Sequence, residues 1–235
     1  MYARNMSGFV AFIASASLFS AAAAHAQDQG IPDIAGTWYQ GAPIPLLPGE
    51  TAPPAMGMGM GMGMGVSASA LQLTDEAQQR MASFDPADDP AVRCEHPGLV
   101  RVLLSPYPMQ IEQYPDQVIL RYEEWAQERT IPIGTEQSPM AEPSPMGNSI
   151  AGYEDGRLVI QTDRLSGGLA MIPEFFWMSD RLTTTEQIYL NARGQLVTDL
   201  VVTDPANLTV PWEVRSTRNP YDGELLDFEC LLRER

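Results

Sequence analysis

The chemistry that this sequence could carry out is mainly acid–base chemistry, and few residue types are available for it. All 14 basic residues are Arg because the sequence contains no Lys, which excludes Schiff-base chemistry and a lysine-held pyridoxal cofactor. His25 lies in an N-terminal segment that we expect to be removed, so His96 would be the only histidine left. A multi-histidine metal site and a Ser-His-Asp triad with spare histidines are then excluded. We expect no metal and no cofactor, and proton transfer would have to use Asp, Glu, Tyr or His96.

Three side chains could carry such proton transfer. Glu123 or Glu186 would be the base, with a pKa raised by burial, and Tyr122 would be the acid. Arg129, together with Asn148, would stabilise negative charge that develops on a substrate oxygen. This set suits a cofactor-independent isomerase, cyclase or lyase, which needs only proton transfer and a shaped cavity.

The sequence favours a simpler function, the binding of a small apolar or aromatic molecule in an interior pocket. Polar contacts to such a ligand would come from hydroxyl, amide and guanidinium side chains, namely Tyr107, Tyr122, Arg129, Asn148, Ser149, Thr162 and Thr183. The two functions differ in where the carboxylates point. Glu123 and Glu186 facing one enclosed cavity with Arg129 would indicate an enzyme, whereas a purely apolar lining would indicate a binding protein.

A hairpin over residues 144–163, with the sequence SPMGNSIAGYEDGRLVIQTD, would position several of these groups. Asp155-Gly156 is typical of a two-residue turn of the primed type. That turn predicts a register in which Ser149 lies opposite Thr162, on one face with the apolar residues Ala151, Tyr153, Leu158 and Ile160. The polar pairs at its open end would lie at a cavity mouth or, equally well, at an ordinary solvated strand end.

A meander over residues 99–132 would position the others. Taking Pro115-Asp116 as its first turn pairs Gln110 with Arg121 and places Tyr122 on the apolar face. An Arg among carboxylates, as at Arg121, is usually a surface network that contributes little to stability. A buried pair of Arg129 with Glu123 would instead hold a polar group of the ligand or set the pKa of the carboxylate.

Short strands separated by turn residues continue to the C-terminus, including a last strand predicted over residues 225–233. One helix is predicted near residues 74–84, capped by Thr74 and stopped by Pro86. The pattern predicts a mainly β protein, an antiparallel closed β-barrel of about 8–10 strands with one short N-terminal helix, with a sandwich as the alternative.

The N-terminal third of the chain divides into a targeting segment and a linker. Residues 1–26 have the basic start, the apolar stretch and the small-x-small cleavage site of a signal peptide, so we expect a periplasmic or secreted protein. Residues 27–70 form an extended segment with a Gly-Met loop over 56–65, and residues 71–235 form the barrel domain. Thioethers in that loop could take up Cu(I), although a tolerated repeat in a loop is the simpler interpretation. No later stretch is apolar enough to span a membrane.

Charge and cysteines restrict the partners and the compartment. The formal net charge is −16, and such a surface repels nucleic acid and anionic lipid headgroups, so the partner should be a small molecule or another protein. Cys94 and Cys230 are predicted to form a disulfide that ties the start of the domain to its last strand, with buried free thiols as the alternative. The sequence gives no indication of oligomeric state.

An ordered set of motifs over residues 71–230 resembles an uncharacterised family of exported bacterial β-barrel proteins. The set comprises LTDEAQQRMASFDPADDPAVRCEHPGLVR, SPYPMQIEQYPDQVILRYE with an Arg six residues after its Glu, MGNSIAGYEDGRLVIQT, SDRLTTTEQ, VVTDPANLTVPWEV and a Cys near the C-terminus. The resemblance implies a lipocalin-like or cyclase-like barrel with an interior pocket. Gly-Thr-Trp at 36–38 is also similar to the first-strand motif of lipocalins.

The chain departs from this family where relatives have histidine. Asn148 stands in a motif that is usually Gly-His-Ser, and the segment 182–187 lacks the histidine that relatives show there. Gln161 likewise replaces an Asp. If those histidines transfer protons in relatives, this chain has lost that step or uses Glu in their place.

Overall fold

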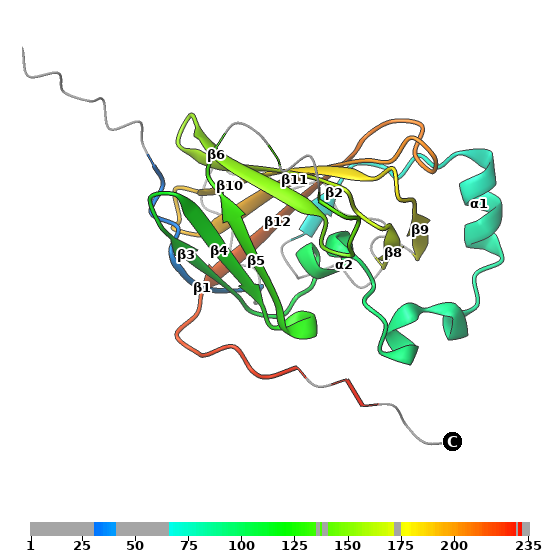
Figure 1. Ribbon diagram of the computed structural model, residues 1–235, viewed down its shortest axis with the longest axis horizontal. Helices are drawn as coiled ribbons and strands as arrows, with labels where there is room; N and C mark the ends of the chain where they lie inside the picture. The colour runs from blue at the N-terminus through cyan, green and yellow to red at the C-terminus, as the bar shows by residue number, and fades with distance from the viewer. Residues whose placement is uncertain are drawn as a thin grey trace, which may run out of the picture.

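Nine antiparallel strands form a nearly closed barrel, as the sequence predicts (Figure 1). The computed structural model describes residues 31–40, 66–134, 137, 141–171, 175–228 and 230–231. The predicted signal peptide and the Gly-Met loop lie outside these residues. The strand order around the barrel is β5 (Gln127–Pro132), β4 (Gln117–Tyr122), β3 (Met109–Gln113), β1 (Gly36–Tyr39), β12 (Trp212–Pro220), β11 (Leu196–Thr203), β10 (Thr183–Leu190), β7 (Arg157–Asp163) and β6 (Asn148–Glu154).

The barrel closes between β5 and β6, the two ends of this strand order, where the described residues form one bridge. Ile133, just after β5, pairs in parallel with Ala151 of β6, and the Gly134 amide donates to the Ala151 carbonyl at 3.0 Å. All the ladders within the barrel wall are antiparallel and longer. The β5–β6 seam is therefore the least hydrogen-bonded join among the described strands.

Turn residues fix the registers that the sequence predicts. Asp155 and Gly156 both have positive φ, 48° and 72°, as the primed turn requires. Ser149 pairs with Thr162 in the β6–β7 hairpin, and Gln110 pairs with Arg121 in the β3–β4 hairpin. The apolar face of each hairpin consequently forms the barrel interior.

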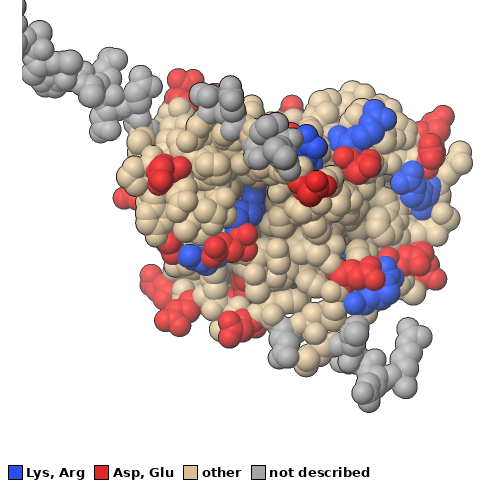
Figure 2. Space-filling view, viewed as in Figure 1, with Lys and Arg blue, Asp and Glu red and all other residues tan. Residues whose placement is uncertain are grey.

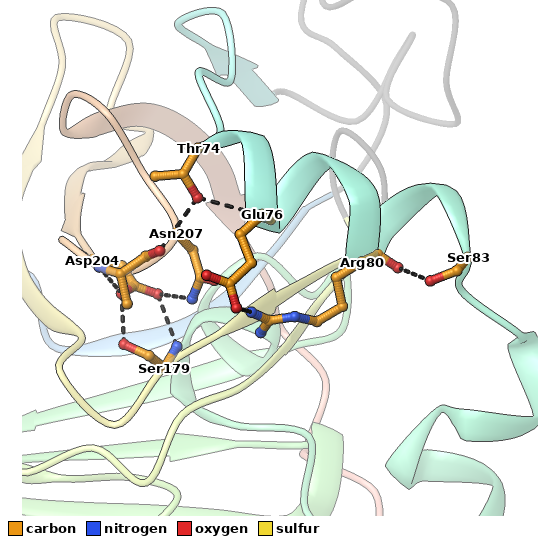
Figure 3. A network of polar contacts seen from close by, with 9 residues as sticks. Thr74, Glu76, Arg80, Ser83, Ser179, Asp204 and Asn207 are labelled. Carbon is orange, nitrogen blue, oxygen red and sulfur yellow. Dashed lines mark hydrogen bonds and ion pairs between the residues drawn. The ribbon is translucent and has the colours of Figure 1, made fainter.

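The helix α1 (Asp75–Ala82) is confirmed with its cap, since the Thr74 hydroxyl accepts from the Ala77 amide. Its start is tied to the β11–β12 loop by a buried network around Asp204 (Figure 3). The carboxylate of Asp204 accepts from the Ser179 amide, the Ser179 hydroxyl and the Asn207 side chain. These hydrogen bonds lower the pKa of Asp204 below its usual value even though burial alone would raise it.

Two predicted strand segments are not strands. Residues 99–108 do not begin the meander, because Leu99–Leu103 forms the short helix α2 and β3 starts only at Met109. Residues 225–228 form no strand, because β12 already pairs with β11 on one side and with β1 and β2 (Val66–Ala68) on the other. The predicted last strand is wrong for that part of the chain, although the disulfide expected there is present between Cys94 and Cys230.

Smaller elements lie beside the barrel. The 3₁₀ helices are Pro86–Asp88, Pro90–Arg93 and Glu124–Ala126. The strands β8 (Gly168–Ala170) and β9 (Phe176–Met178), which the sequence pattern does not predict, pair with each other. They lie between the barrel and α1 (Figure 1).

Segments near both ends of β3 are hydrogen-bonded to residues of the barrel. Before β1, the fully buried Ile34 donates its amide to Gln113 at 2.9 Å, and Gln113 in turn donates to Tyr153 across the barrel at 3.0 Å. Before β3, the carbonyls of Leu103 and Ser105 accept from Arg218.

No helix in the described part of the chain is long and apolar enough to cross a membrane.

The outer surface is strongly charged. Figure 2 shows acidic side chains scattered over one face, most of them towards its margin, with arginines beside several of them. On β4, Arg121 pairs with Glu112 and Glu128, and all three side chains are at least one-third exposed. Such pairs contribute little to stability, so this network is the surface feature that the sequence predicts.

Candidate functional site

A cluster of buried polar side chains lies inside the barrel wall. Residues that alternate along a strand share a face, and the register puts Thr184 opposite Thr162 and Glu186 opposite Ile160. Because Ile160 and Thr162 are buried, Glu186 and Thr184 of β10 face the interior with them. Their exposed fractions are 0% and 3%.

Arg129 is the centre of this cluster. Its Nη1 donates to the Tyr122 hydroxyl at 3.1 Å, and its Nη2 donates to Ser149 Oγ and Thr162 Oγ1, each at 3.0 Å. The two hydroxyls, on β6 and β7, are also 2.9 Å apart and hydrogen-bonded to each other. Arg129 comes from β5, so its side chain spans the inner side of the β5–β6 seam.

Glu186 is the counter-ion of Arg129. Arg129 Nη1 lies 2.9 Å from Glu186 Oε1, and the two side chains are 4% and 1% exposed. The contact is an ion pair without hydrogen-bond alignment, because within the described structure neither carboxylate oxygen of Glu186 accepts a hydrogen bond. The attraction between the two groups is mainly electrostatic. Burial opposes the charge of Arg129, but Glu186 and Tyr122 raise the pKa of Arg129 above its ordinary value.

Tyr122 is a neutral hydrogen-bonding group in this environment. Burial raises its pKa to about 12, and the charge of Glu186 acts in the same direction, while Arg129 opposes the shift. The phenol therefore keeps its proton at neutral pH and can only donate or accept a hydrogen bond there. A role as general acid would require another group to lower its pKa.

A second buried guanidinium, that of Arg218, comes from β12. Its Nη2 donates to the Leu103 and Ser105 carbonyls at 2.9 and 3.1 Å, and its Nη1 donates to Ser216 Oγ at 3.2 Å. Burial lowers the pKa of Arg218, and the charges of Tyr122 and Glu186 oppose that shift. Arg218 is thus close enough to the Arg129 cluster to interact with it electrostatically.

The residues predicted for the site divide into two groups. The structure brings together Arg129, Tyr122, Ser149, Thr162 and Glu186. Asn148 and Thr183 are adjacent in sequence to the inward-facing Ser149 and Thr184, so they lie on the outer face of the wall. Neither therefore contributes its side chain to the interior cluster.

The remaining two predicted residues lie elsewhere. Tyr107 is 51% exposed in the loop before β3. Glu123 lies just after β4, where its carboxylate accepts the Leu226 amide at 3.0 Å. The buried pair that the sequence suggested between Arg129 and Glu123 is instead a pair between Arg129 and Glu186.

Two members of the cluster were not predicted. Thr184 is one residue away from the predicted Thr183, and its hydroxyl has no hydrogen-bond partner among the described residues. Arg218 lies on the same face of β12 as the buried residues Trp212, Val214 and Ser216, because every second residue of a strand faces the same side. That period of two was visible in the sequence and could have placed Arg218 inside.

The described residues include no group of three or more His, Cys, Asp or Glu side chains that could hold a metal ion. The cluster instead offers one carboxylate acceptor, several hydroxyls and two guanidinium donors. Such a set can orient a polar group of a small molecule or hold a carboxylate in place as a base.

No protein-family model matches the chain. No curated protein shows significant sequence similarity to it. The class that fold and site define is an antiparallel β-barrel with a polar centre in its interior.

Proposed function

We propose that the protein binds a small apolar or aromatic molecule inside the barrel, with the Arg129–Glu186 pair as its polar anchor. The observation that carries this proposal is the Glu186 carboxylate, which is fully buried and accepts no hydrogen bond within the described structure. A buried charge without hydrogen bonds lowers stability. A bound ligand that donates to it would remove that cost.

The surroundings of the anchor favour an apolar body for the ligand. Beside the polar cluster, the inner faces of the strands carry buried aliphatic side chains, namely Leu120, Ile131, Leu158, Ile160, Leu200 and Val214. Binding sites of this kind combine an apolar lining with a few polar groups that fix orientation. The resemblance to exported lipocalin-like barrels supports the same function.

We also propose that the protein is exported to the periplasm or secreted. The disulfide between Cys94 and Cys230 supports this location, because disulfides persist mainly in oxidising compartments. The predicted signal peptide over residues 1–26 is its second support.

Native mass spectrometry of the protein purified from the envelope of its own host tests the binding proposal. We expect a fraction of the wild-type protein to carry an additional small-molecule mass that denaturation releases. The double variant R129M/E186L should lose this mass, while the outer-face variant E213Q, at an exposed position, should keep it. Wild-type protein without any adduct, or an adduct unchanged in the double variant, would contradict the proposal.

A second candidate function is a cofactor-independent isomerase, cyclase or lyase in the same site. One observation favours it: Glu186, Arg129 and Tyr122 lie in one buried cluster, and a base without hydrogen bonds is free to accept a substrate proton. Incubating the retained ligand with the protein in D₂O tests it by NMR. Deuterium incorporation that E186Q abolishes would support catalysis, and its absence in the wild type would leave binding as the function.

A further inference from the structure

The unmet hydrogen bonds of the cluster indicate which polar group the ligand must bring. Each oxygen of Glu186 can accept two hydrogen bonds, and none is supplied by the described residues. The guanidinium groups differ in this respect. Both terminal nitrogens of Arg129 and of Arg218 donate to oxygen atoms. Their Nε atoms have no hydrogen-bond partner among the described residues, but each Nε carries one hydrogen, so the carboxylate with its four acceptor positions has the larger unmet capacity.

The aligned hydrogen bonds of the Arg129 terminal nitrogens go to hydroxyl groups. Its Nη2 already serves Ser149 and Thr162, and its Nη1 serves Tyr122. The opposite charges of Arg129 and Glu186 nevertheless compensate each other, because Arg129 Nη1 lies 2.9 Å from Glu186 Oε1. A second anion beside Glu186 would be repelled by that carboxylate and attracted by Arg218, which lies within electrostatic reach of it, whereas a neutral hydroxyl meets no such repulsion.

Thr184 adds a second unmet group on the same face of β10. It is two residues from Glu186, so the two side chains project in the same direction, roughly 7 Å apart along the strand. The Thr184 hydroxyl is buried and has no partner within the described structure. A hydroxyl can both donate and accept, so it could serve a ligand oxygen while that oxygen donates to Glu186.

We propose that the ligand carries a hydroxyl group on an apolar body, and that this hydroxyl donates a hydrogen bond to the Glu186 carboxylate beside Thr184. This inference rests on the proposed binding function and narrows its ligand class. The ligand is a phenol or an alcohol of small size. No bond is formed or broken in the binding step.

Three naphthalene probes of nearly equal size separate the alternatives at neutral pH. They are 2-naphthol, which donates a hydrogen bond, 2-methoxynaphthalene, which cannot donate, and 2-naphthoate, which is an anion. We expect wild-type protein to bind 2-naphthol about tenfold or more tightly than 2-methoxynaphthalene, because a hydrogen bond to a charged acceptor is strong. Binding is measured by quenching of probe fluorescence and by calorimetry.

Variants at the two unmet groups connect this preference to the site. E186Q should reduce the preference for 2-naphthol to a few-fold, and T184V should weaken 2-naphthol binding while leaving 2-methoxynaphthalene unchanged. E213Q on the outer face of β12 should behave like the wild type. If E186Q fails to fold, T184V and R129M/E186L still test the proposal, because the double variant removes the acceptor together with its counter-ion.

The outcomes distinguish this inference from the function on which it rests. Equal affinity for 2-naphthol and its methyl ether would overturn the hydroxyl inference and leave the binding function standing. Tightest binding of 2-naphthoate would also overturn it and would indicate an acidic ligand. Binding of none of the three probes would count against the binding function itself.

Discussion

At the scale of single residues, the buried Arg129–Glu186 pair makes its two members mutually dependent. Removing one partner leaves a buried charge without compensation, which typically costs about 3–5 kcal/mol, whereas replacing both by apolar side chains is often neutral. We expect R129M alone to lower the free energy of unfolding by about that amount, and R129M/E186L to recover most of it. Urea denaturation followed by circular dichroism measures both, with the exposed-pair variant R121M as a control. A double variant no more stable than R129M would contradict this account.

Tyr122 should make stability depend on pH in the alkaline range. Its phenol has a pKa of about 12 in the folded protein against an ordinary 10.0, so between these values the unfolded chain releases a proton that the native state keeps. The contribution of the neutral phenol to the free energy of unfolding is fully present below pH 10. It is lost as the pH rises towards 12, by about 3 kcal/mol in all. Urea midpoints of wild type and Y122F across this range measure the difference. Parallel curves for the two proteins would rule the effect out.

The sequence predicts the members of this cluster only where a hairpin turn fixes which residues of the two strands lie opposite each other. The Asp155-Gly156 turn correctly places Ser149 opposite Thr162, because two-residue turns fix pairing directly. The partner of Arg129 is not local, so no turn register identifies it as Glu186. Since neighbouring residues on a strand face opposite sides, Tyr122 and Glu123 could not both face the interior.

At the scale of elements, the C-terminal segment is held by one covalent link and a few contacts. Phe228 packs on Trp125, with ring centroids 5.1 Å apart, while Leu226 is 71% exposed. The disulfide to Cys94 closes a loop with a sequence separation of 136. A loop of that length stabilises the fold by about 5 kcal/mol in the chain-entropy model.

We expect reduction of this disulfide to lower the free energy of unfolding by up to about 5 kcal/mol. Urea denaturation of wild-type protein with and without reductant measures the loss. C94A/C230A should match the reduced wild type and should not respond to reductant. A reduced wild type as stable as the oxidised protein would show that the link does not constrain the unfolded chain.

A strand-like sequence pattern is a less reliable guide where the segment has no neighbouring strand to pair with. Residues 225–228 have strand-like composition, but β12 offers no free edge to pair with. The apolar segment at 99–103 forms α2, because a short apolar run cannot be assigned to helix or strand from periodicity alone. Capping is more reliable, since Thr74 and its acidic first turn are purely local signals.

At the scale of the whole molecule, closure of the barrel depends on the β5–β6 seam. β11 pairs along its length with both β10 and β12. Between β5 and β6 the described residues supply one backbone bridge, at Ile133 and Ala151, and the side chain of Arg129 reaching Ser149. Strands with backbone groups unpaired on one side open at lower free energy than strands paired on both.

Hydrogen exchange should therefore reveal the seam as the most readily opened part of the barrel wall. We expect peptides from β5 and β6 to exchange faster than those from β11, because among the described residues a single backbone bridge pairs them across the seam. A disulfide in I133C/A151C, whose positions are paired across the seam, should slow exchange in β6 and leave β11 unchanged. The same variant under reducing conditions is the matched control. Protection of β6 equal to that of β11 in the wild type would mean that the barrel is closed as firmly at the seam as elsewhere.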